Sequence, residues 1–295
     1  MSPSRGGQTE IVSPDTGVEV HRDLAYASVD GRSLTLDLYM PEHRTDACPV
    51  VLYLHGGAFM VGTKRDFAQE RLLPLAHSGI AVASAEYRFS AIATYPAQLH
   101  DVKAAVRWLR AHAAEHGYRD QRVGAWGASA GAYLALMLAL TSGSGEHEGT
   151  LGDHPEARSS VEAVTAWFAP TDLLTADAFH PPPDRRPPPF ISGPPPQPSI
   201  LARLLGVANV AENAGLAASA SPLTYAAEAT GAFLLMHGDR DALISEDQSR
   251  RLHAALGAAG ADSTLLLVAG ANHEDPAFDG PAVLGAVSEF FRARL

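Results

Sequence analysis

The sequence is short of the residues on which several classes of protein depend. Cys48 is the single cysteine among 295 residues, which excludes an intrachain disulfide and leaves no thiolate cluster for zinc. Lysine and arginine together number 22, against 33 acidic residues, and the net charge of −11 gives no general attraction to phosphate backbones. We therefore expect no nucleic acid partner.

Long apolar segments and internal repeats are also lacking. No apolar run follows Met1, so neither a secretory signal nor a membrane anchor is readable. We expect a cytoplasmic protein without membrane contact, and a homodimer is compatible with the sequence. Because no repeat period is detectable, the fold must follow from the order of the predicted elements.

The chain is predicted to form one domain behind a short arm. Residues 1–17 are polar and rich in Ser, Pro and Gly, which predicts a flexible N-terminal arm, and residues 18–295 suit a single domain. Apolar and polar residues alternate over 34–38 after the turn signal Asp30-Gly31. This pattern indicates a half-buried strand that leaves a hairpin, and hence an antiparallel start.

Short apolar runs of the kind found in covered strands then alternate with helical patterns. One helix face follows residues 99–113 and ends at Gly117, and Ser245 with Gln248 forms a capping-box signature for another helix. Strands are predicted at 50–54, 80–83, 123–126, 163–168, 232–236 and 264–268, and further helices at 132–140 and 283–291. The alternation predicts an α/β fold with a mainly parallel, doubly wound sheet and a functional surface at the carboxyl ends of its strands.

A glycine-flanked serine follows the predicted strand 123–126. The segment Gly127-Ala128-Ser129-Ala130-Gly131 joins this strand to a helix. A serine nucleophile must protrude from a strained turn, and the glycines let neighbouring backbone pass without Cβ clashes. In a chain with 26 glycines the five-residue pattern alone also fits a structural turn, but its position between strand and helix favours Ser129 as a nucleophile.

A second glycine turn follows the predicted strand 50–54, with the sequence His55-Gly56-Gly57-Ala58-Phe59. Backbone N–H groups freed in such a turn stabilise the negative charge that ester hydrolysis places on a carbonyl oxygen. Gly57, Ala58 and Ala130 are the predicted donors. Without the Ser129 motif, an ordinary loop with a packed His55 would explain this segment.

Acid and base candidates follow two later strands. Asp241 ends the segment His237-Gly238-Asp239-Arg240-Asp241, and His273 ends Gly270-Ala271-Asn272-His273. A serine hydroxyl needs an imidazole to take its proton, and a carboxylate must orient that imidazole. The order Ser129, Asp241, His273 is that of a hydrolase triad. Asp239 is assigned to the turn, through bonds to the backbone, and His237 to a structural role.

Together these segments, with Glu86-Tyr87-Arg88 and Pro96-Ala97, resemble the small carboxylesterases related to hormone-sensitive lipase, and more closely the branch of acetyl-xylan and feruloyl-type esterases. The resemblance covers about residues 18–295. This chain departs from the usual pattern of that family at two positions. Ala58 stands in place of the family's third glycine, and Ala128 stands in place of the acidic residue that usually precedes the nucleophile. The resemblance implies an α/β-hydrolase fold, ester hydrolysis and no cofactor or metal.

A Pro-rich segment interrupts the pattern of strands and helices. Residues 181–198 hold ten of the 21 prolines and predict no regular structure except polyproline II. The resemblance places a cap in this connection. Residues 174–206 therefore form either a short Pro-rich cap, with Phe179, Phe190 and Ile191 lining a pocket, or a disordered surface loop.

A histidine pair on the helix that ends at Gly117 offers a weaker signal. His112 and His116 have the spacing of a metal-binding pair, but no third ligand is evident and Ala113 stands where a metalloprotease helix carries Glu. A solvated helix face is the preferred interpretation of this pair.

The whole pattern predicts a serine carboxylesterase that acts on short-chain carboxylic esters through an acyl-enzyme. An arylformamidase-type amidase and a catalytically silent binder of a small ligand are the alternatives. A prolyl-oligopeptidase-like peptidase is disfavoured, because 295 residues leave no room for a propeller.

Overall fold

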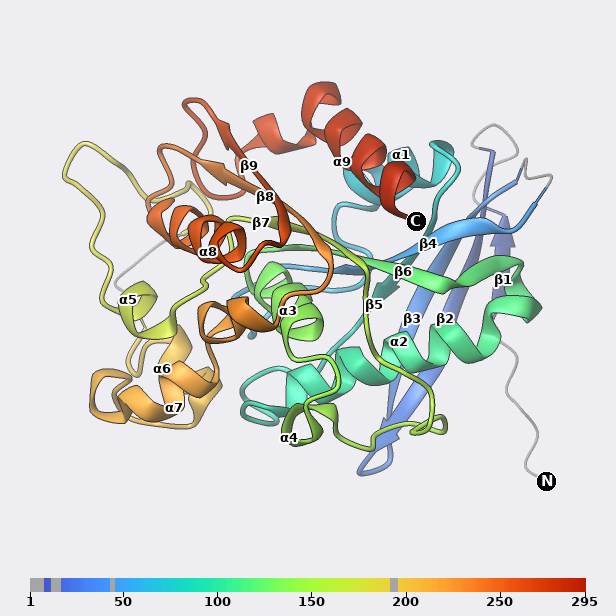
Figure 1. The fold of residues 1–295 in the computed structure, drawn as a ribbon, viewed down its shortest axis with the longest axis horizontal. Helices are drawn as coiled ribbons and strands as arrows, with labels where there is room; N and C mark the ends of the chain where they lie inside the picture. Colours follow the sequence, from blue (N-terminus) through green and yellow to red (C-terminus); the bar gives the residue numbers. More distant parts are fainter. Residues whose placement is uncertain (1–7, 12–16, 43–45, 192–195) are drawn as a thin grey trace.

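One sheet organises the part of the chain that the structure describes. The structure, a computed structural model, describes residues 8–11, 17–42, 46–191 and 196–295. The strands are β1 Gln8–Ile11, β2 Val18–Val29, β3 Arg32–Pro41, β4 Cys48–Leu54, β5 Ala81–Ala85, β6 Tyr118–Ala128, β7 Ala163–Trp167, β8 Ala232–Gly238 and β9 Asp262–Val268. Their order in the sheet is β1-β2-β3-β5-β4-β6-β7-β8-β9 (Figure 1).

Pairing is antiparallel from β1 to β5 and parallel from β5 to β9. Helices cover both faces, with α1 and α9 on one side and α2, α3 and α8 on the other (Figure 1). The α-helices are α1 Leu73–His77, α2 Ala97–His116, α3 Ala130–Leu140, α4 Gly145–Glu148, α5 Leu173–Asp177, α6 Ile200–Leu205, α7 Ala214–Ser219, α8 Asp247–Ala258 and α9 Pro281–Arg294. The shorter helical turns are η1 Ala68–Leu72, η2 Ala211–Asn213, η3 Pro222–Glu228 and η4 Pro276–Asp279. The predicted α/β-hydrolase fold, with its doubly wound sheet and antiparallel hairpin, is confirmed.

Burial explains why the central strands carry nearly continuous apolar runs. β5, β7 and β8 are buried at every residue, since helices cover them on both sides. The helix α3 is buried all round, and it runs against β6 and β7 at the centre of the molecule. In contrast β9 lies at the edge and has no buried residue. The apolar run at 264–268 therefore forms an edge strand rather than a covered one.

The register of the parallel strands brings their carboxyl ends to one edge. Leu54 at the end of β4 pairs with Gly127 of β6, and Trp167 at the end of β7 pairs with Ala128 of β6 and Met236 of β8. The segments that follow β4, β6 and β8 therefore start side by side. Val268 at the end of β9 pairs with Gly238 of β8, so the segment after β9 starts at the same edge. The segments after β4, β6, β8 and β9 carry the predicted site residues.

Two local predictions are wrong. Gln8–Ile11, inside the predicted arm, pairs as β1 with β2, while residues 1–7 and 12–16 lie outside the described residues. The predicted capping box also does not form: α8 has Glu246 at its N-cap, and the Gln248 side chain instead accepts hydrogen bonds from the Thr171 and Asp172 N–H groups. The Gln248 side chain therefore binds a distant loop and not the N-terminus of α8, to which the local pattern assigned it.

The histidine pair of α2 is also not on a solvated face. His112 is half-buried, its Nδ1 lies 2.9 Å from the Trp108 carbonyl oxygen and its ring stacks on Trp108. His116 is half-buried, with its ring 5.1 Å from that of His21. Within the described ranges no group of three or more metal-ligating side chains is arranged to hold an ion.

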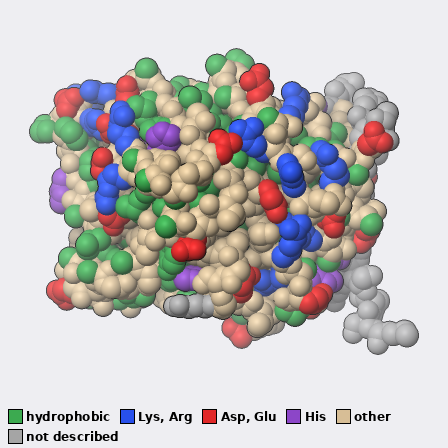
Figure 2. All heavy atoms as spheres, viewed as in Figure 1, with side chains coloured by type: hydrophobic (Ala, Val, Ile, Leu, Met, Phe, Trp, Pro, Cys, Tyr) green, Lys and Arg blue, Asp and Glu red, His purple; other side chains and the backbone are tan. Residues whose placement is uncertain are grey.

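Charge and hydropathy of the surface are mixed. Acidic and basic side chains lie interspersed over the face shown in Figure 2. None of the helices in the described part of the chain combines the length and the apolar character that crossing a bilayer requires.

Candidate active site

Ser129 stands in a strained turn between β6 and α3. Its backbone has φ +53° and ψ −115°, a conformation that a residue with a side chain seldom adopts. The flanking glycines are required by contact: a Cβ at Gly131 would collide with the carbonyl oxygen of Leu54, and one at Gly127 with the backbone of Gly131. This turn is therefore held by close backbone packing between β4, β6 and α3.

His273 links Ser129 to Asp241. The His273 Nε2 atom lies 2.9 Å from the Ser129 Oγ, and the Nδ1 atom lies 2.7 Å from Asp241 Oδ2. An ionised carboxylate can only accept, so Nδ1 carries the proton of a neutral imidazole, and Nε2 is left to accept from the serine hydroxyl. The three predicted residues are thus brought together as one hydrogen-bonded chain.

Asp241 is fully buried and held in place by its own turn. Its other oxygen, Oδ1, accepts from the N–H groups of Leu243 and Ile244 at 2.8 and 2.9 Å. Burial acts to raise the pKa of Asp241, but His273 and His237 outweigh it and hold the pKa well below its usual range. The group remains a carboxylate at any pH near neutrality.

The two competing residues of the same segment have other contacts. Asp239 Oδ1 accepts from the Gly270 N–H at 2.7 Å, across the turn from His273. His237 lies with Nδ1 2.7 Å from Ser249 Oγ and Nε2 3.0 Å from the Ile244 carbonyl oxygen. Asp239 thus connects the loop that carries Asp241 to the loop that carries His273, whereas His237 connects the Asp241 loop to α8.

The turn after β4 has an unusual backbone conformation, and its N–H groups are predicted hydrogen-bond donors. Gly57 and Ala58 have φ of +110° and +56°, and a Cβ at Gly57 would collide with the carbonyl of Val61. No hydrogen bond between described residues takes up the N–H of Gly57 or Ala58. Ala130 opens α3, where the N–H groups of the first turn have no partner within the helix. The geometry leaves these donors available.

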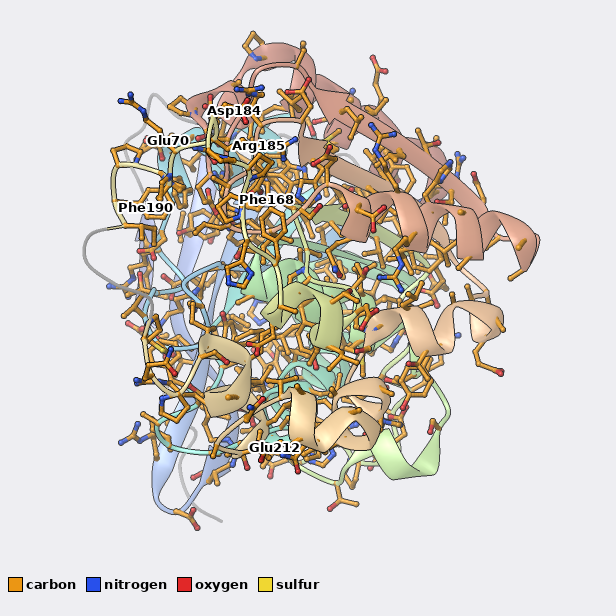
Figure 3. The ribbon with its side chains drawn as sticks, turned by 90° about the vertical axis from the view of Figure 1, so that its left-hand side faces the viewer. Glu70, Phe168, Asp184, Arg185, Phe190 and Glu212 are labelled. Atoms are coloured by element: carbon orange, nitrogen blue, oxygen red, sulfur yellow. The ribbon has the colours of Figure 1, made fainter. Side chains whose placement is uncertain are left out.

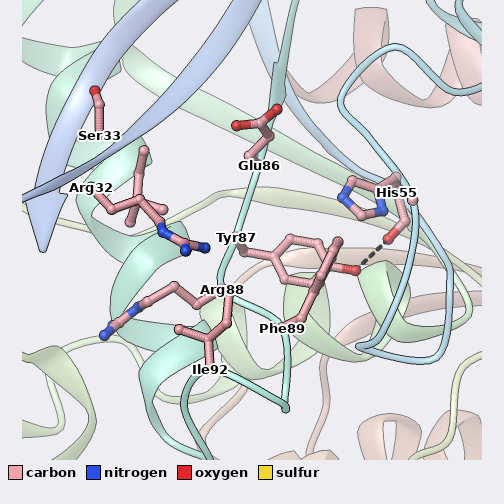
Figure 4. Close-up of a pocket in the computed structure, with 10 residues that line it drawn as sticks. Arg32, Ser33, His55, Glu86, Tyr87, Arg88, Phe89 and Ile92 are labelled. Atoms are coloured by element: carbon pink, nitrogen blue, oxygen red, sulfur yellow. Dashed lines mark hydrogen bonds between the residues drawn. The ribbon is translucent and has the colours of Figure 1, made fainter. Parts of the chain in front are cut away.

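His55 is packed beneath this turn. Its ring stacks on Tyr87, 4.6 Å between centroids, and Tyr87 Oη donates to the His55 carbonyl oxygen at 2.9 Å. Burial lowers the pKa of His55. A cavity of about 160 Å³ lies beside the ring, between Arg32, Glu86 and Tyr87 (Figure 4). Ser129 does not line this cavity.

Asn272 has a structural role that the sequence did not indicate. Its Oδ1 accepts from the N–H groups of Ala242 and His273 at 3.0 and 2.8 Å, and its Nδ2 donates to the Arg186 carbonyl oxygen at 2.8 Å. One amide side chain therefore connects the loop that carries Asp241 (the acid loop), the loop that carries His273 (the base loop) and the Pro-rich segment. The one available signal was a polar side chain directly before His273 at a strand end.

The Pro-rich segment is attached to the same loops. Arg185 donates to the Asp241 carbonyl oxygen at 3.1 Å and pairs with Glu246 at 3.0 Å. Figure 3 labels Asp184, Arg185 and Phe190 of this segment. The ring of the buried Phe168 is 4.5 Å from that of His273. Phe190 and Ile191 are exposed and Phe179 is half-buried, while residues 192–195 lie outside the described part.

Comparisons with known proteins identify a family and several relatives of this chain. The BD-FAE family model matches residues 36–256. Esterase LipQ and the probable carboxylic ester hydrolase LipM of Mycobacterium tuberculosis are 29% and 28% identical over 78% and 84% of this chain. The matches cover 51% and 56% of those proteins, so the chain spans about half the length of the curated relatives it matches.

Solved structures are similar over nearly the whole chain. A truncated carbohydrate esterase from gut microbiota has a TM-score of 0.82 and 27% identity, covering 95% of this chain and 98% of that one. Esterase 2 of Thermogutta terrifontis with bound propionate has a TM-score of 0.71 and 23% identity, covering 95% and 96%, which supports the fold. The resemblance to α/β-hydrolase esterases is confirmed, and the chain belongs to the BD-FAE family.

Proposed function

We propose that this chain is a serine carboxylesterase that hydrolyses short-chain carboxylic esters, with Ser129 as nucleophile, His273 as base and Asp241 as the group that orients the base. The observation that carries the proposal is the hydrogen-bonded chain from Ser129 Oγ through His273 to the buried Asp241 carboxylate. A serine hydroxyl becomes nucleophilic only when such an imidazole accepts its proton.

The reaction proceeds through an acyl-enzyme. His273 Nε2 takes the proton of Ser129 as Oγ attacks the ester carbonyl, and the imidazolium then protonates the departing alcohol. Water, deprotonated by His273, attacks the acyl-enzyme and releases the acid, and the proton returns to Ser129. The negative oxygen of each tetrahedral intermediate is stabilised by the N–H groups of Gly57, Ala58 and Ala130, at about 3 to 4 kcal/mol for each donor.

Acyl length rests on weaker support. An acetyl esterase of Salmonella is 33% identical over 135 residues, which cover 46% of this chain. We infer from this similarity that short acyl groups are preferred. The proposed reaction uses no cofactor or metal ion, because the three side chains supply nucleophile and base. A cytoplasmic location, a homodimer and a cap function of residues 174–206 stay predictions.

A substrate panel tests the proposal. Wild type and Ser129→Ala are compared on nitrophenyl esters from acetate to decanoate and on N-formylkynurenine. We expect turnover by wild type with an optimum at acetate to butyrate, and loss of turnover in the variant. Turnover of N-formylkynurenine alone would favour the amidase, and no turnover of either class would favour a silent binder. Equal turnover by both proteins would reject Ser129 as nucleophile.

A further inference from the structure

A second group of charged side chains lies directly after His273. Arg71, at the end of the π-helical turn η1, is completely buried. Its Nε donates to Asp279 at 2.6 Å, its Nη2 to Glu274 Oε2 at 2.7 Å and its Nη1 to Tyr53 Oη at 3.3 Å. Two carboxylates share one guanidinium, so the group carries a net negative charge.

Arg71 holds both ends of the loop that follows His273. Its guanidinium lies over the rings of Phe67 and Trp167, at 3.7 and 5.0 Å from their centroids. Burial acts to lower the pKa of Arg71, but the surrounding partners keep it raised, so the cation persists. Because a buried cation is stable only when it is paired, Glu274 and Asp279 are both held tightly in place.

Glu274 has a second oxygen, Oε1, that lies near Gly56 and the Ser129 turn. No hydrogen bond between described residues uses Oε1, and the side chain is 13% exposed. A Cβ built at Gly56 would lie 3.2 Å from this oxygen and 3.6 Å from Ser129 Cβ. Glu274 also has φ +52°, a conformation that a residue with a side chain adopts only when its surroundings impose it. The free carboxylate oxygen thus occupies space beside the Ser129 turn.

We propose that Glu274, held by Arg71, is a positioning residue that stabilises the imidazolium of His273 during acyl transfer. This inference rests on the proposed function, which makes His273 the base. When the proton of Ser129 moves to His273 Nε2, the ring becomes positive. A net negative group held by Arg71 near the Ser129 turn lowers the energy of that state without entering the reaction.

Other charged groups around His273 have defined places. Asp241 faces Nδ1 from the loop after β8, and His237 lies behind it, with Nε2 3.4 Å from the same carboxylate oxygen. Arg185 reaches the Asp241 carbonyl oxygen from the Pro-rich segment. On the side of β7 the contact is the uncharged ring of Phe168. Glu274 follows His273 directly in the chain, and its carboxylate is held by Arg71.

Glu274→Gln and Asp279→Asn form a matched pair. Each substitution removes one of the two carboxylate charges that pair with Arg71 and keeps an oxygen that can accept a hydrogen bond from Arg71. Only Glu274 lies beside Gly56 and Ser129. For Glu274→Gln we expect the pKa on the acid side of the kcat/KM profile to fall by about one unit, with up to a tenfold lower plateau. For Asp279→Asn we expect a clearly smaller shift. Equal shifts in the two variants would overturn the proposal.

A direct titration separates this inference from the proposed function. The imidazole signal of His273, assigned by its loss in His273→Gln, is followed by NMR against pH in folded wild type and both variants. A lower pKa in Glu274→Gln supports the electrostatic role even if no ester is turned over, whereas an unchanged pKa in an active esterase rejects it. Glu274→Asp keeps the negative charge, so we expect the His273 pKa in this variant to stay near that of wild type. This variant replaces Glu274→Gln in the test if Glu274→Gln does not fold. A shift in Glu274→Asp as large as in Glu274→Gln would contradict the proposal.

Discussion

One site receives two kinds of segment, which are built differently: the turns after β4, β6, β8 and β9, and the excursion between β7 and β8. The turns are closed by backbone contact, as where Gly131 packs on Leu54 and holds Ser129 at φ +53°. The described part of the excursion, which includes α5, α6 and α7, has no helix longer than seven residues. Its Pro-rich part reaches the acid and base loops through a few polar contacts, chiefly those of Arg185 and Asn272.

This difference separates two kinds of contribution. A steric contact between backbone atoms cannot be relaxed without moving the strands, so the turns fix the positions of the reacting groups. A polar contact can be removed singly at a modest cost in free energy. Substitutions in the turns should therefore abolish chemistry or folding, and substitutions at the excursion contacts should only lower the rate.

The largest effect is expected from Asp241→Asn. An amide in place of the carboxylate can donate to Nδ1 and stabilise the wrong tautomer of His273, so kcat should fall about 10,000-fold. Asp239→Asn is the matched control, because Asp239 contacts the Gly270 N–H and not His273. Steady-state kinetics on nitrophenyl acetate measure both. A greater loss in Asp239→Asn would reassign the acid.

Gly131→Ala should destabilise the fold. The new Cβ meets the Leu54 carbonyl oxygen, which cannot move without its strand, so we expect a loss of about 3 kcal/mol in the free energy of unfolding. Gly285→Ala in α9 adds its Cβ to open space and should stabilise by about 0.5 to 1 kcal/mol. Urea unfolding gives both values. A neutral Gly131→Ala would show that the turn tolerates a side chain.

Asn272→Ala tests the link between the turns and the excursion. It leaves the N–H groups of Ala242 and His273 without their acceptor and releases Arg186, so we expect kcat/KM to fall about 30-fold. Asn209→Ala removes an exposed hydrogen bond to Ala211 far along the chain and should stay within about twofold. Wild-type activity in Asn272→Ala would mean that the loops that carry Asp241 and His273 keep their positions without this side chain.

Arg185→Ala should have the smallest effect. The variant loses the ion pair with Glu246 and the hydrogen bond to the Asp241 carbonyl oxygen. We expect this loss to cost about 1 kcal/mol of transition-state stabilisation, which corresponds to a kcat/KM about fivefold lower. Arg240→Ala removes the exposed pair with Asp184 and should be silent. A loss above a hundredfold in Arg185→Ala would place this side chain in the reaction itself, and the comparison between the two regions would fail.

Local patterns were sufficient to predict the turns and not the contacts between them. Glycines and polar residues directly follow the apolar runs of β4, β6, β8 and β9 in the sequence. Their periodicity and order therefore predict Ser129, Asp241 and His273 as site residues. Parallel strands then bring their ends to one edge, whatever the connections between them.

The remaining features depend on residues far apart in the chain. Arg71 and Glu274 are separated by 203 positions, and Gln248 leaves its expected capping role for Thr171, 77 positions away. No window of the sequence contains both partners of such a contact. The pairing of Gln8–Ile11 with β2 was missed because polar residues rich in Ser and Gly surround those four residues.

Peptide mass spectrometry after reaction with a fluorophosphonate probe tests the central claim most directly. A serine activated by His273 attacks the phosphorus and keeps the adduct, so wild type should be labelled on the peptide that contains Ser129. Labelling should disappear in Ser129→Ala and slow by several orders of magnitude in His273→Ala. A label on another residue, or equal labelling of wild type and Ser129→Ala, would contradict the account.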